Sequence, residues 1–91
     1  MAIFAIIKQP GTPDNVGEAV RTHFPSSNYD LGSGAWLVAA PSTAMDVSET
    51  LGIKSGVNGS AIVIEAASYY GRANPAIWSW IKANWEGSAL G

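Results

Sequence analysis

The sequence of 91 residues predicts an α+β domain, and three features lead to this class. Short apolar runs typical of strands alternate with segments whose apolar residues recur at helical spacing. Hydrophobic residues make up 47% of the chain and charged residues only 13%, a composition that fits a folded core and excludes ordinary disorder. No linker, repeat or low-complexity segment interrupts the chain, so we expect a single domain over residues 1–91.

Four segments have the pattern of strands. Residues 2–7 form an unbroken apolar run that stops before Pro10-Gly11. Residues 28–31 and 35–39 flank Gly32-Ser33-Gly34, an arrangement that predicts a hairpin. Residues 60–67 follow a glycine-rich turn and predict the last strand.

Three further segments predict helices. The first, over 13–24, begins at the N-cap Thr12 and ends at Pro25. The second runs to about residue 51, with Ser42 as its N-cap and Gly52 as its stop. Asn74 caps a third over 76–86. One face of this helix carries an apolar stripe, and Trp80 lies outside it; the stripe consists of Ile77, Trp78, Ile81 and Trp85.

The order of these elements is strand, helix, strand, strand, helix, strand and a final helix. This order predicts a ferredoxin-like βαββαβ fold, in which right-handed crossovers place the two main helices on one face of a four-stranded antiparallel sheet. The other face is then left open. We expect the Trp-rich C-terminal helix or a second subunit to cover it.

Several phrases of the chain resemble a known family: Gly34-Ala35-Trp36-Leu37-Val38, Ser42 at a helix start, Ala61-Ile62-Val63-Ile64, and Trp78-Ser79-Trp80-Ile81-Lys82. They look like the SinR-like small bacterial proteins, which are distantly similar to the smaller CRISPR adaptation nuclease. The resemblance implies a ferredoxin-like subunit that pairs into a homodimer through its sheets. In the nuclease relatives an Asp at the end of the first strand is the proposed metal ligand. Here that strand ends Ile7-Lys8-Gln9-Pro10, which speaks against nuclease activity.

Aromatic and polar or basic side chains suggest a ligand site at Lys8, Gln9, Tyr70 and Arg72, with Tyr69 and Lys82 as neighbours. Such a group can stack on and neutralise single-stranded nucleic acid or a small ligand. The alternative is that both tyrosines pack beneath the last helix. Five basic residues and a net charge of −2 disfavour nucleic acid as the partner.

A second set of residues is expected to pack in the core or across a dimer: Trp36, Glu65, Trp78, Ile81 and Trp85. Glu65 alternates with Ile64 along its strand. We therefore expect the Glu65 carboxylate on the open face of the sheet or at a subunit interface.

No cofactor or metal is expected. The chain has no cysteine and one histidine, His23, which we place at a helix end. Asp46 and Glu49 are expected on a solvated helix face. The sequence thus favours a non-catalytic, homodimeric interaction domain in the cytoplasm, without a membrane span or signal peptide. The alternatives are a metal-dependent nuclease and a binder of nucleic acid or a small ligand.

Overall fold

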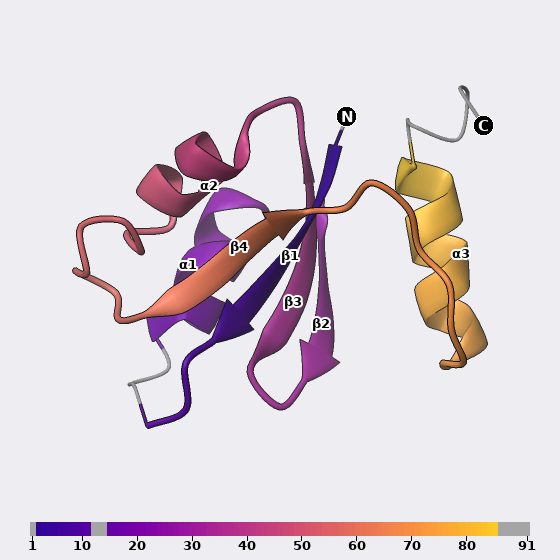
Figure 1. Ribbon diagram of the computed structural model, residues 1–91, viewed down its shortest axis with the longest axis horizontal. Coiled ribbons are helices and arrows are strands. Elements are labelled where there is room, and N and C mark those ends of the chain that lie inside the picture. The colour runs from indigo at the N-terminus through magenta and orange to yellow at the C-terminus, as the bar shows by residue number, and fades with distance from the viewer. Residues whose placement is uncertain (1, 12–14, 86–91) are drawn as a thin grey trace.

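A computed structural model describes residues 2–11 and 15–85 and contains a four-stranded sheet and three helices (Figure 1). The elements in chain order are β1 (Ala2–Lys8), α1 (Asn15–His23), β2 (Asn28–Gly32), β3 (Ala35–Ala40), α2 (Ala44–Thr50), β4 (Ala61–Glu65) and α3 (Pro75–Asn84). The strands lie in the order β2-β3-β1-β4, and every neighbouring pair is antiparallel. The predicted α+β class and ferredoxin-like arrangement are confirmed.

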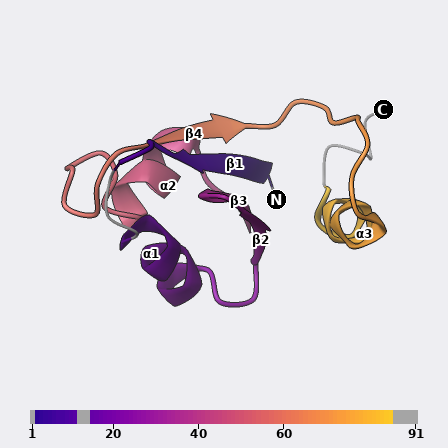
Figure 2. The same cartoon turned by 90° about the horizontal axis from the view of Figure 1, so that it is seen from below.

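The sheet separates two helical layers. Helices α1 and α2 lie on one side and α3 lies on the other (Figure 2). Strand alternation divides β1 accordingly, because successive side chains point to opposite faces. Phe4 and Ile6 belong to the core beneath α1 and α2, whereas Ile3 belongs to a separate cluster with Ile81 of α3.

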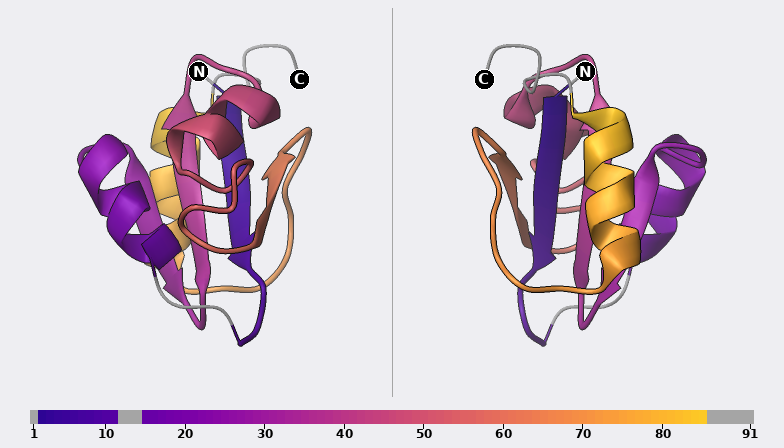
Figure 3. Two further views of the ribbon diagram at one scale, coloured as in Figure 1. Left: turned by 90° about the vertical axis from the view of Figure 1, so that its left-hand side faces the viewer. Right: turned by 90° about the vertical axis from the view of Figure 1, so that its right-hand side faces the viewer.

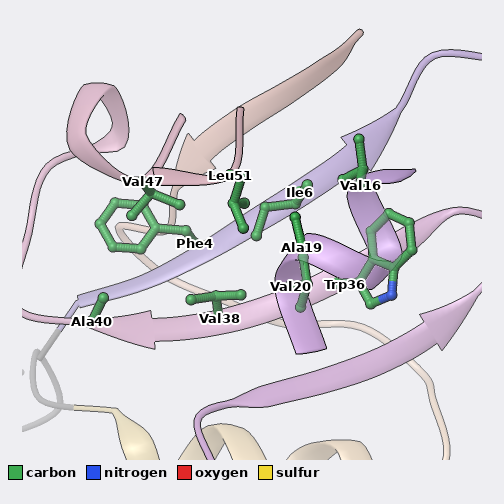
Figure 4. Close-up of a cluster of buried hydrophobic side chains, with 10 residues drawn as sticks. All are labelled: Phe4, Ile6, Val16, Ala19, Val20, Trp36, Val38, Ala40, Val47 and Leu51. Atoms are coloured by element: carbon green, nitrogen blue, oxygen red, sulfur yellow. The ribbon is translucent and has the colours of Figure 1, made fainter. Parts of the chain in front are cut away.

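The larger core lies between the sheet and the first two helices (Figure 4). Its fully buried side chains come from two strands and from both helices, so no one element could form it alone. The members of this cluster are Phe4, Ile6, Val16, Ala19, Val20, Trp36, Val38, Ala40, Val47 and Leu51. The indole nitrogen of Trp36 is buried without a hydrogen-bond partner within the described residues, so packing alone holds this ring.

Helix α3 covers only part of the opposite face. Ile81 is buried against Ile3 and Ala39, and the partly buried residues around them are Leu37, Ile77, Trp78, Trp80 and Trp85. Figure 3 (right) shows α3 in front of β3 and β2, with β1 and β4 to one side of it. The prediction that the Trp-rich helix covers the open face is therefore right for one half of the sheet.

Local side chains determine where the helices begin and end. The N-cap of α2 is Thr43 rather than the predicted Ser42, because the Thr43 hydroxyl accepts a hydrogen bond from the Asp46 amide at 3.1 Å. Gly52 ends this helix as predicted, with a φ of +72° that favours glycine. Asn74 caps α3 as predicted, accepting from the Ala76 amide at 2.9 Å. The predicted cap Thr12 lies outside the described residues.

Candidate functional site

Three isoleucines form an exposed patch on the half of the sheet that α3 leaves uncovered. Ile7 of β1 is 44% exposed, and Ile62 and Ile64 of β4 are 56% and 49% exposed. Ile7 pairs directly with Ile62, and Ile64 pairs with Ala5, so these side chains share one face of two adjacent strands. We call Ile7, Ile62 and Ile64 the isoleucine patch.

The patch reaches the free edge of the sheet, because β4 is an outer strand. The Ala66 amide donates to the Ile3 carbonyl at 2.8 Å, and the Gln9 amide donates to the Ser60 carbonyl at 2.9 Å. Hydrogen-bonded pairs alternate along an antiparallel ladder. The backbone groups of Ala61, Val63 and Glu65 therefore point away from β1, toward the open edge. Figure 2 shows β4 at this edge of the sheet.

The other outer strand, β2, offers a less regular edge. Its ladder with β3 shifts register between Asp30 and Gly32, whereas the β4 ladder has no shift. Asp30 also turns its carboxylate to its own chain, accepting from the Gly32 amide at 2.7 Å. Irregularities of this kind hinder edge-to-edge pairing, so β4 is the edge better suited to another strand.

A cluster of aromatic rings lies between the segment after β4 and helix α3. Tyr69 stacks on Trp78 with ring centres 5.9 Å apart and meets Trp85 edge-on at 5.0 Å. This arrangement agrees with the expectation that the tyrosines pack against the last helix, but only for Tyr69. Tyr70, by contrast, is fully exposed.

A shallow hollow of about 320 Å³ lies beside these rings, lined by Tyr69, Tyr70, Gly71, Trp78 and Lys82. Its aromatic walls and the Lys82 ammonium group suit a flat, negatively charged group. Because Tyr70 on its wall is fully exposed, the hollow is open to solvent.

The residues predicted to form a ligand site do not come together. Lys8 pairs with Ala61 at the start of β4, and Gln9 follows it. Tyr70 and Arg72 follow the opposite end of β4, where Glu65 pairs with Phe4. Figure 1 shows β4 starting on the left and ending near the middle of the molecule, from where the chain continues toward α3 on the right. The register therefore sets Lys8 and Gln9 beside the start of β4 and places Tyr70 and Arg72 beyond its end.

The residues predicted to pack in the core or a dimer have different surroundings. Trp36 and Ile81 are buried, in the larger core and in the α3 cluster respectively. Trp78 and Trp85 are partly buried around Ile81. Glu65 is exposed and shares the face of Val63, which packs toward α1 and α2. The expectation of an open-face carboxylate is wrong, because that face carries Ile62 and Ile64.

The titratable side chains of the described residues do not form a metal centre: no group of three or more His, Asp or Glu could hold an ion. Glu49 instead pairs with Lys54 at 3.2 Å on the surface. His23 is exposed at the end of α1, on the rim of a hollow of about 200 Å³ that it shares with Asn15, Glu18, Ala19, Thr22 and Asn58.

Trp80 has a structural role that the helical stripe did not predict. The centre of its ring lies 6.1 Å from that of Tyr29 in β2, and the ring packs on the cluster of Ile3, Ala39 and Ile81.

Because Trp80 is only partly buried, we expect Trp80→Ala to lower the free energy of unfolding by about 2 kcal/mol, below the 3–5 kcal/mol of a fully buried ring. Urea unfolding measures this loss. Trp80→Phe keeps a ring against Tyr29 and should lose less, whereas equal losses would contradict the contact.

Searches of protein-family models, curated proteins and solved structures find no match to this chain. The resemblance to SinR-like proteins therefore stays a prediction from the sequence. Among the described residues, no helix has the length and apolar character needed to cross a bilayer. The isoleucine patch beside the free β4 edge combines exposed apolar surface with backbone groups that point away from β1.

Proposed function

We propose that this domain is a non-catalytic interaction module that pairs with a second copy of itself through the uncovered half of its sheet. The observation that carries the proposal is the isoleucine patch: three large aliphatic side chains on two adjacent strands, each about half exposed. Contiguous apolar surface of this kind is typical of interaction sites rather than of surface facing water.

The composition supports a partner for this surface. Only 13% of the residues are charged, about half the usual fraction. Depletion of charge is characteristic of the centre of a subunit interface. A second copy is the occupant we favour, because most soluble oligomers are symmetric homo-oligomers, in which the same patch serves as the interface on both subunits.

Light scattering tests the proposal. We expect the chain to have about twice its 9.5 kDa mass at micromolar concentration. Ile64→Lys places a charge within the patch and should give the monomer mass. Circular dichroism would confirm that the variant is folded.

Met45→Lys is the matched control. Met45 is 60% exposed, but it lies on α2, on the other side of the sheet from the patch. This variant should remain a dimer. A monomeric parent chain, or equal dissociation of both variants, would refute the proposal.

A further inference from the structure

We infer that the two copies join strand to strand, with β4 antiparallel to β4 of the partner subunit and a two-fold axis at Val63. The two sheets then form one continuous sheet of eight strands, twice the four of one chain. This inference rests on the proposed homodimer and specifies how it is built.

The backbone of β4 is self-complementary about Val63. The outward-pointing groups belong to Ala61, Val63 and Glu65, which are symmetrically spaced around the central residue. In this register Val63 faces Val63 of the partner subunit, and Ala61 faces Glu65 of the partner subunit. A shift of one residue would set outward-pointing groups against inward-pointing ones, and a shift of two would leave an end residue of β4 without a partner.

The same register brings the isoleucine patches together. Ile62 lies opposite Ile64 of the partner subunit in a non-hydrogen-bonded pair, where side chains approach most closely. Ile7 extends the row on the adjoining strand. The two half-exposed patches become one apolar row across four strands, in which Ile62 and Ile64 of one copy pack side by side against Ile64 and Ile62 of the other.

The charges at the seam are compatible with this pairing. Glu65 faces the small Ala61 of the partner subunit, not a second carboxylate. Within each copy, Lys8 of β1 pairs with Ala61 of β4. Glu65 of one copy is therefore two strand spacings, about 10 Å, from Lys8 of the other copy. Each Glu65 carboxylate therefore approaches a positive charge of the other copy, on the same side of the sheet.

Single-cysteine variants test the register, because the chain has no cysteine of its own. Ile62→Cys and Ile64→Cys, mixed and mildly oxidised, should form a covalent dimer, since their Cα atoms would lie about 4.5 Å apart, within disulfide range. Either variant alone should cross-link little, because identical residues would lie about 8 Å apart. A mixture of Ile62→Cys with Met45→Cys is the control and should not cross-link.

A second pair of variants tests the edge hydrogen bonds. Glu65→Pro removes an outward-pointing amide without touching the ladder to β1, whereas Glu65→Ala keeps that amide. Because each dimer loses two donors, Glu65→Pro should raise the dimer dissociation constant at least about tenfold over Glu65→Ala.

The outcomes separate the two proposals. Cross-linking in the mixture together with weaker association of Glu65→Pro supports the pairing. A dimer by light scattering that cross-links only within one variant, or not at all, overturns the pairing and leaves the homodimer standing. A monomeric parent chain overturns both.

Discussion

Replacing Phe4 by alanine is expected to lower the free energy of unfolding by about 3–5 kcal/mol, the range for a fully buried aromatic ring. Phe4 is 0% exposed and lies between Val38 of β3 and Glu65 of β4 in the sheet register. Figure 4 shows its ring next to Val47 of α2. A chain of this length is stable by only about 5–14 kcal/mol, so this one cavity removes a large share of the total.

Urea unfolding at fixed protein concentration measures this loss. Val57→Ala is the control, because Val57 is 75% exposed and its truncation should change stability by no more than about 0.5 kcal/mol. Similar losses for the two variants would mean that Phe4 does not anchor the core between the sheet and α2.

The order of elements could be predicted from the sequence because each element carries a local signal. Asn74 at the start of α3 and Gly52 after α2 act through hydrogen bonds and backbone angles of their immediate neighbours. The capping error at Ser42 has the same local origin: two adjacent hydroxyl residues compete, and Thr43 is the one in reach of the Asp46 amide.

The surroundings of side chains could not be predicted in the same way, because they depend on contacts between distant segments. Alternation correctly separates Glu65 from Ile64, but it does not say which face α3 covers. The helical stripe identifies Ile81, yet Trp80 is held by Tyr29, a residue far away in the chain. Lys8 and Tyr70 are grouped by residue type, which does not say that Lys8 lies beside the start of β4 and Tyr70 beyond its end.

The partial cover by α3 explains why the candidate site lies where it does. Ile3 and Ile7 belong to the same face of β1, but only Ile3 is buried by Ile81. The helix lies over β3 and β2 (Figure 3). Its tryptophans Trp78, Trp80 and Trp85 are partly buried around Ile3, Ala39 and Ile81. Ile7, Ile62 and Ile64 remain beyond its reach, so one apolar face is divided into a closed half and an open half.

Ending the chain after Ala73 should remove α3 and expose the half of the apolar face that this helix covers. The loss of α3 exposes Ile3, Leu37 and Ala39, and fully burying one large aliphatic or aromatic side chain contributes about 1.5–3 kcal/mol. The entropy regained by the deleted helix offsets part of this. We therefore expect the free energy of unfolding, measured in urea, to fall by about 3–5 kcal/mol. Light scattering should show species larger than a dimer, because the newly exposed apolar face is continuous with the isoleucine patch.

The control Ser79→Ala changes an exposed position of α3 and should alter neither property. If the shortened chain kept the stability and mass of the parent, α3 would not be part of the folded unit, and its tryptophans would have to act on another surface.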